Sequence, residues 1–198
     1  MHVSPSEAAQ WTALLIQSRR TTLPKRLCGP GPDGEQKNRI LEAAAAAPDH
    51  NQLLPWRFIE VPPSHRENLG QAFQSALLER DPTADDDACS QAREKAQRSP
   101  WLLLAVVRPE GGTAEVPAAE RLLSAGAAIQ NMLLMATAFG LGSALTSGRA
   151  LQSTALRALF RLNDDEQALC FINIGNIVEP RKVRSRPELE RYFSVLGQ

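Results

Sequence analysis

The segment from Ala118 to Phe139 is apolar almost all round, and it constrains the fold more than any other part of the chain. At helical spacing its large apolar side chains point in every direction, and Gln130 and Asn131 add little polar surface. Such a helix must be buried on most sides. In a chain of 198 residues one layer of strands cannot cover it completely. We therefore expect it to be both the spine of the core and half of a subunit interface, with a monomeric core helix as the alternative.

Helical and strand patterns alternate along the rest of the chain. Trp101 to Val107 is a continuous apolar run of strand length, typical of a central strand covered on both faces. The sequences from Asp33 to Gln36 and from Ser64 to Glu67 fit capping boxes at helix starts. The other expected elements are helices 7–18, 35–47, 64–79, 88–98 and 153–160, strands 57–61, 142–146 and 168–178, a C-terminal segment 187–196, and loops 81–87 and 110–116.

Composition and charge narrow the possible classes of protein. With 43% hydrophobic residues the chain can build one sizeable core, so we expect a single domain over residues 1–198. The 22 basic and 22 acidic residues balance, and the basic ones are scattered, which argues against nucleic acid or an anionic membrane as a partner. Cys28, Cys89 and Cys170 lack the spacing of a disulfide framework or a zinc site. Since no apolar run is long enough to span a bilayer and no leader pattern is present, we expect a soluble, cytoplasmic protein without a metal site.

Two short segments carry most of the functional information. Ser18 to Thr22 places two guanidinium groups and several hydroxyls at the end of the first helix, a combination suited to gripping a phosphate. Two arginines at a helix C-terminus are also favourable partners for the helix dipole. The second segment, Ala47 to Phe58, places a polar loop between an alanine-rich helix and the Pro55-Trp56 turn into a strand.

These segments, in this order, resemble the FMN-dependent nitroreductases, in which a helix ending in Arg-Arg-Ser precedes a Pro-x-x-x-x-x-Gln-Pro-Trp-x-Phe block. Three further stretches fit in sequence: Ser124 to Gly126, Gly140 to Gly148, and Ile174 to Asn176. With Pro48-Asp49-His50 the chain is most similar to the compact bacterial branch of NAD(P)H nitroreductases.

The resemblance implies an α+β, nitroreductase-like fold, with a central, mainly antiparallel sheet flanked by helices. It also implies a homodimer in which the long buried helix packs against the same helix of the second subunit and FMN lies at the subunit boundary. The implied activity is that of an NAD(P)H-dependent flavin oxidoreductase: NADPH or NADH reduces FMN, and an oxidised acceptor such as a nitro compound or quinone takes the electrons. Because the cofactor carries the chemistry, no catalytic side chain is assigned. Acceptor choice is expected to depend on loops 81–87 and 110–117.

Arg19, Arg20 and Thr21 match the phosphate-binding Arg-Arg-Ser of the family, with a threonine hydroxyl in place of serine. Arg184 and Arg186 resemble late basic residues that close on the phosphate in larger relatives, and a solvated basic tail is the alternative interpretation.

The polar loop is implied to reach a flavin in the neighbouring subunit. His50 matches a histidine of the compact branch that does so, although a solvated or structural histidine is the alternative. Gln52 falls where larger relatives have an amide near the isoalloxazine edge. Leu54 stands where the family usually has glutamine, so one polar contact is lost.

Leu145, Thr146 and Ser147 match a Trp-Arg-Ser triplet that meets the flavin ring and phosphate in the compact relatives. Thr146 therefore removes a positive charge near the cofactor, for which Arg20 or His50 could compensate. The same relatives place the dinucleotide at the end of the apolar helix, without a glycine-rich phosphate fingerprint. The matching residues are Met135, Ala136, Thr137, Ala138, Phe139 and Gly140.

Three alternatives stay open from the sequence. The first is a flavin-binding dimer without efficient turnover, suggested by Leu54 and Thr146. The second is a thiol enzyme with Cys28 as nucleophile, placed beside Gly29 and near Arg26. The third is a structural α+β dimer.

Overall fold

The computed structural model describes residues 4–110, 116–179 and 185–197. Its described part holds a sheet of five strands in the order β1-β5-β3-β2, with β4 also pairing with β5. Every strand pair is antiparallel. The strands are β1 (Leu27–Cys28), β2 (Trp56–Glu60), β3 (Trp101–Val107), β4 (Gly142–Thr146) and β5 (Gln167–Ile177).

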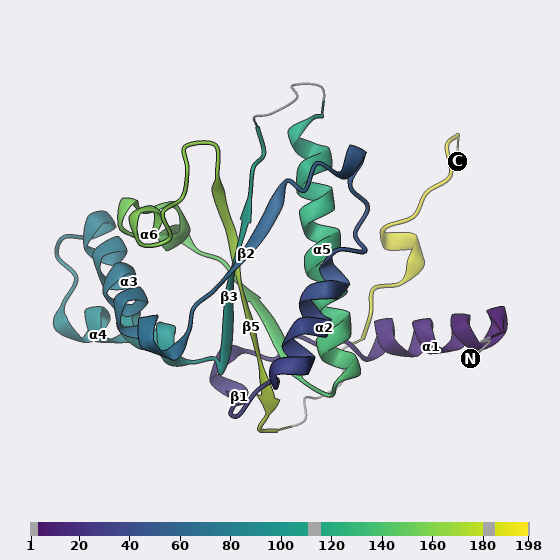
Figure 1. The fold of residues 1–198 in the computed structure, drawn as a ribbon, viewed down its shortest axis with the longest axis horizontal. Helices are drawn as coiled ribbons and strands as arrows, with labels where there is room; N and C mark the ends of the chain where they lie inside the picture. Colours follow the sequence, from purple (N-terminus) through teal and green to yellow (C-terminus); the bar gives the residue numbers. More distant parts are fainter. Residues whose placement is uncertain (1–3, 111–115, 180–184, 198) are drawn as a thin grey trace.

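Helices cover both faces of this sheet (Figure 1). One face carries α2 (Gly34–Ala44) and α5 (Ala118–Ala138). The other carries α3 (Arg66–Arg80), α4 (Asp86–Glu94) and α6 (Thr154–Leu159). The molecule is therefore a sandwich of three layers, and the predicted α+β class with a mainly antiparallel sheet is confirmed.

β3 is the centre of the sandwich, because all its residues are buried. Successive side chains of a strand point to opposite faces. Trp101 and Leu103 accordingly join the core beneath α2 and α5, whereas Leu102 and Leu104 join the core beneath α3 and α6. The prediction of a central strand covered on both faces is confirmed, with the same limits.

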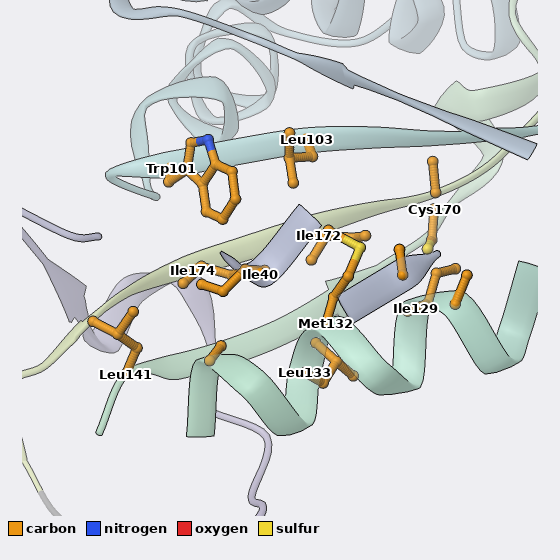
Figure 2. Close-up of a cluster of buried hydrophobic side chains, with 14 of the residues drawn as sticks. Ile40, Trp101, Leu103, Ile129, Met132, Leu133, Leu141, Cys170, Ile172 and Ile174 are labelled. Carbon is orange, nitrogen blue, oxygen red and sulfur yellow. The ribbon is translucent and has the colours of Figure 1, made fainter. Parts of the chain in front are cut away.

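The core on the α5 side explains why that helix is so apolar. Figure 2 shows Ile129, Met132 and Leu133 of α5 gathered below the sheet residues Ile172 and Ile174. Each fully buried side chain of this size contributes about 1.5–3 kcal/mol relative to its exposed state. This half of α5 is thus held firmly against the sheet.

The opposite side of α5 carries exposed apolar side chains. Leu123 is 72% exposed and Leu122 is 40% exposed in the single chain. Within the described residues no layer of the same chain covers this side, so the expected burial against a second subunit stays a prediction. Among the described residues, no helix is both long enough and apolar enough to span a membrane, and this includes α5.

The two ends of the chain lie outside the three layers. α1 (Pro5–Ser18) projects away from the sheet, and the C-terminal segment lies above it on the side of α5 (Figure 1). Every residue of α1 is exposed or half-buried, including Trp11 at 57%. Within the described C-terminal residues 185–197, the regular structure is a single 3-10 turn, Leu189–Arg191.

Local capping decides where helices begin. The predicted capping box at Asp33 is confirmed, since its Oδ1 accepts from the Gln36 N–H at 2.8 Å and Gln36 Oε1 accepts from the Asp33 N–H at 3.1 Å. The predicted box at Ser64 is wrong. Pro62 and Pro63 instead lead into a 3-10 turn, and α3 begins at Arg66 without a side-chain cap. α4 begins within the predicted loop 81–87, because Asp85 caps it by accepting from the Ala88 N–H at 2.8 Å.

Candidate functional site

The Arg-Arg-Thr motif is tied to the sheet at the end of α1. Thr21 forms a parallel bridge with Ser143 of β4, and the Thr22 N–H donates to the Ser143 main-chain oxygen at 2.8 Å. Arg19 and Arg20 are half-buried here, although α1 itself lies outside the layers. The bridge therefore fixes two guanidinium-bearing residues beside the start of β4.

A third cation arrives from the far end of the chain. Arg186 Nη2 donates to the main-chain oxygen of Arg19 at 3.0 Å. Burial lowers the pKa of Arg19, and the neighbouring positive charges of Arg186 and Arg20 lower it further. Within the described residues no carboxylate forms an ion pair with any of these three arginines. Like charges held this close repel one another, so a bound anion would stabilise the group.

Arg20 also has a structural role. Its Nη1 donates to the main-chain oxygens of Gln17 and of Arg19, the latter at 3.0 Å. These bonds satisfy carbonyl groups at the C-terminus of α1, as the helix-dipole interpretation predicts. Because a guanidinium carries five N–H donors, the Nε and Nη2 groups of Arg20 remain for another acceptor.

β4 leads from this cluster to a large cleft at its other end. We call this the basic cleft, and its volume is about 780 Å³. Thr146 and Ser147 contribute to its wall, and Asn173 of β5 is buried beside them. Asn173 Nδ2 donates to Thr146 Oγ1 at 3.0 Å, which holds the threonine hydroxyl in place. The lining residues are Leu23, Pro24, Lys25, Phe73, Leu77, Arg80, Ala88, Gln91, Ala92, Lys95, Arg98, Leu102, Thr146, Ser147, Gly148, Arg149, Ala150, Leu151, Phe171 and Asn173.

The basic cleft was not predicted from the sequence. Five cations line it, and its described lining contains no aspartate or glutamate. They come from four segments of the chain, so basic residues that are scattered along the sequence gather on one surface of the fold. The five are Lys25, Arg80, Lys95, Arg98 and Arg149. Thr146, which stands where the resemblance implied that an arginine had been lost, lines the same cleft as these cations.

The loop after α2 is held in an unusual backbone conformation. Asn51, Gln52 and Leu54 have φ values of 51°, 55° and 47°, in the left-handed region that side-chain-bearing residues rarely adopt. The Leu54 N–H donates to Asp49 Oδ2 at 2.7 Å, and Arg108 Nη2 donates to the Leu54 oxygen at 3.1 Å. Each such residue costs of the order of 1–3 kcal/mol, and strain of this kind clusters at functional sites.

His50 lies in a second cleft, of about 570 Å³, between this loop and the start of α5. Its Nδ1 is 2.9 Å from Glu120 Oε2, and exposed Leu123 forms part of the same wall. Neither His50 nor Gln52 lines the basic cleft of its own chain. Their assignment to a flavin of the neighbouring subunit stays a prediction.

Residues Met135 to Gly140, the predicted dinucleotide segment, form the C-terminal end of α5 and the turn after it. Ala136 is fully buried, and Met135 and Phe139 pack against the core. Arg39 of α2 stacks over the Phe139 ring at 5.7 Å. The segment lines neither cleft, and its role in binding NAD(P)H stays a prediction.

The cysteines and acidic groups give little support for thiol chemistry or for a metal site. Cys28 is exposed, whereas Cys89 and Cys170 are buried, and all three are unpaired. Burial raises the pKa of the Cys170 thiol to about 11. Among the described residues no group of histidine, cysteine, aspartate and glutamate side chains is arranged to hold a metal ion.

Comparison with known proteins identifies the family. The profile of the nitroreductase family matches residues 16–176. The chain belongs to the nitroreductase family. A protein of Haemophilus influenzae named "Putative NAD(P)H nitroreductase" is 32% identical over 165 residues, which cover 83% of this chain and 88% of that protein. The Escherichia coli K12 protein "Putative NAD(P)H nitroreductase YdjA" is 34% identical, with 82% and 85% covered.

Solved structures show the same fold as this nitroreductase-family chain. A nitroreductase-like protein from Bacillus cereus superposes with a TM-score of 0.79 at 16% identity, covering 100% of this chain and 98% of that one. A nitroreductase with bound FMN from Bacteroides fragilis gives a TM-score of 0.70 at 19% identity, covering 93% and 97%. The predicted nitroreductase-like fold is confirmed.

Proposed function

We propose that this chain is an FMN-dependent oxidoreductase that passes electrons from NADPH or NADH to an oxidised acceptor such as a nitro compound or a quinone. Membership of the nitroreductase family and the NAD(P)H nitroreductase names of its relatives support this proposal. When bound, FMN supplies the redox chemistry, because it accepts electrons from a nicotinamide and gives them to the acceptor.

The cluster of Arg19, Arg20 and Arg186 is the observation that carries the proposal. Three guanidinium groups without a carboxylate partner among the described residues match the donor set that a phosphate monoester requires. In our proposal they hold the FMN phosphate, and the Thr21 hydroxyl contributes beside them. The bridge to Ser143 holds the motif beside β4, which supports this role.

The residues at the end of β4 would face the flavin ring. Leu145 and Thr146 end the strand that the arginine cluster flanks, and Ser147 follows it directly, so one strand would carry both contacts. Thr146 is oriented by Asn173, and Lys25 and Arg149 in the same cleft would compensate for the arginine absent at position 146. Positive charge there would favour the anionic form of a reduced flavin.

We propose a homodimer that uses the exposed side of α5. Leu122, Leu123 and Leu54 expose apolar surface around the His50 cleft, where burial by a second copy would be favourable. In that dimer His50 and Gln52 would reach the neighbouring subunit's flavin. The strained loop that carries Gln52 would then be held by contacts across the interface.

The donor, the acceptor and the compartment complete the proposal. We propose that Met135 to Gly140 bind NAD(P)H and that loops 81–87 and 110–117 determine which acceptor is used. Residues 111–115 of the second loop lie outside the described part. The three unpaired cysteines support a reducing compartment, and we propose the cytoplasm.

The visible spectrum of freshly purified protein tests the proposal directly. The expected result is two flavin peaks that bleach on anaerobic addition of NADPH or NADH, with FMN identified by mass after release. An Arg19→Gln variant should lose bound FMN, whereas Lys37→Gln, on α2, should retain it. A colourless wild-type protein that FMN cannot reconstitute would refute the proposal.

The same experiment separates the alternative of a flavin-binding dimer without efficient turnover. The exposed, apolar Leu54 at a position where the family usually has glutamine favours that alternative. It predicts a yellow protein whose peaks persist after addition of either nicotinamide.

A further inference from the structure

We propose that the basic cleft is the acceptor site and that it selects aromatic acceptors bearing a negative charge, such as a carboxylate. This inference rests on the proposed function and specifies the substrate class of the same site. Four segments of the chain build the charged part: Lys25 before β1, Arg80 at the end of α3, Lys95 and Arg98 after α4, and Arg149 after β4.

The charges of the basic cleft are largely uncompensated. None of its five cations forms an ion pair with a carboxylate among the described residues. Arg80 also acts on Asp81, but the pKa of that carboxyl is lowered chiefly by hydrogen bonds from Thr83 and only last by the charge of Arg80. A concave surface lined by one sign of charge attracts ligands of the opposite sign and raises their local concentration.

The apolar part of the cleft fits an aromatic ring. Phe73 and Phe171 meet edge to face with centroids 5.5 Å apart, and both line the cleft beside buried Leu102. A volume of about 780 Å³ lies within the range of about 300–1,000 Å³ found for small-molecule sites. An aromatic body would lie on this wall, and its charged group would reach the cations at the rim.

The position of the cleft favours an acceptor over a regulatory ligand. Thr146 and Ser147, which we assign to the flavin ring, belong to the same cleft as Lys95 and Arg98. A ligand held by these cations therefore lies next to the proposed site of electron transfer. The buried amide of Asn173 and the Thr146 hydroxyl that it holds provide polar groups in the same cleft.

Equilibrium binding to the purified, oxidised protein tests this assignment. The probes are 4-nitrobenzoate and its neutral analogue 4-nitrobenzyl alcohol. The variants are Lys95→Gln and Arg98→Gln, both exposed positions without a proposed role at the flavin, and the matched control is Lys37→Gln. Flavin content and melting temperature are measured for each variant to confirm that it is folded and loaded.

Each cleft variant should weaken 4-nitrobenzoate binding about threefold to tenfold and leave 4-nitrobenzyl alcohol binding unchanged. The KM for 4-nitrobenzoate should rise in parallel, and added salt should reduce the difference between the two probes. The control should behave like the wild type.

Two results would overturn the inference. One is equal binding of the charged and neutral probes, unaffected by either cleft variant. The other is a raised KM for NADPH with unchanged 4-nitrobenzoate binding, which would assign the cations to the phosphates of the donor. Either result leaves the proposed function intact if NADPH still bleaches the flavin peaks. The proposed function is tested separately by the visible spectrum, and a colourless protein would refute it.

Discussion

Arg186 Nη2 donates to the main-chain oxygen of Arg19 across 167 positions of sequence, at 3.0 Å. The bond brings a cation from the C-terminal segment to the motif that ends α1. Its significance is electrostatic, since the pKa of Arg19 is lowered by burial first and by the charge of Arg186 next. An anion bound here would relieve that repulsion.

Replacing this late arginine should weaken cofactor binding. Arg186→Gln removes one positive charge from the cluster, and we expect the Kd for FMN to rise about tenfold, as for the loss of one charge-assisted hydrogen bond. Fluorescence quenching of added FMN by the apoprotein measures this Kd. Arg191→Gln, in the same segment, is the control. An unchanged Kd for Arg186→Gln would instead assign it to a solvated basic tail.

The exposed leucine of α5 should control oligomeric state. Leu123→Glu places a charge on a side chain that is 72% exposed in one subunit and that we expect to be buried in the dimer. Loss of about 1.5–3 kcal/mol per copy should convert the dimer to monomers at micromolar concentration. Analytical ultracentrifugation measures the change, with Leu78→Glu on α3 as the control. A Leu123→Glu protein that stays dimeric would place the interface elsewhere.

An ion pair at the edge of the sheet should make stability depend on pH. Arg57 Nε and Nη2 donate to the two carboxylate oxygens of Glu166 at 2.6 and 2.8 Å. The hydrogen bond from Arg57 is the main reason why the pKa of Glu166 is lowered from 4.5, and it outweighs the effect of burial. The stabilisation is thus present above the unfolded pKa and is lost as pH falls through the folded pKa.

Urea unfolding of Glu166→Gln against wild type tests this pair. At pH 7 the variant should be less stable by about 1–3 kcal/mol, because Arg57 is half-exposed and part of its charge stays solvated. The difference should shrink as pH falls below about 4.5. A difference that stays constant from pH 7 down to pH 3 would contradict the assigned cause.

The exposed cysteine should be dispensable for electron transfer. Cys28→Ser should keep wild-type reduction of the flavin, because Cys28 lines neither cleft. Brief alkylation of the folded protein should modify Cys28 before buried Cys170, whose thiol has its pKa raised to about 11 and stays protonated at neutral pH. Mass spectrometry locates the label. Loss of activity in Cys28→Ser would revive the thiol-enzyme alternative.

The sequence predicted well those features that depend on neighbours along the chain. The limits of β3 and β4 agree with the expected ones, and α5 ends at Ala138 against an expected 139. A buried strand or helix shows its period directly in the residue order, and Asp33 finds its capping partner only three positions away. The Ser64 box failed because two adjacent prolines override a capping preference.

The same distinction between local pattern and tertiary packing applies to the candidate site. The sequence alone determined the Arg19-Arg20-Thr21 motif, the family and the apolar nature of α5, because each is written in a short, contiguous pattern. Only the tertiary structure decided that Arg186 joins the motif, that five scattered cations line one cleft, and that Leu123 faces outward. Those relationships arise when packing of the core brings distant segments together, and no local pattern encodes the distance between side chains on different layers.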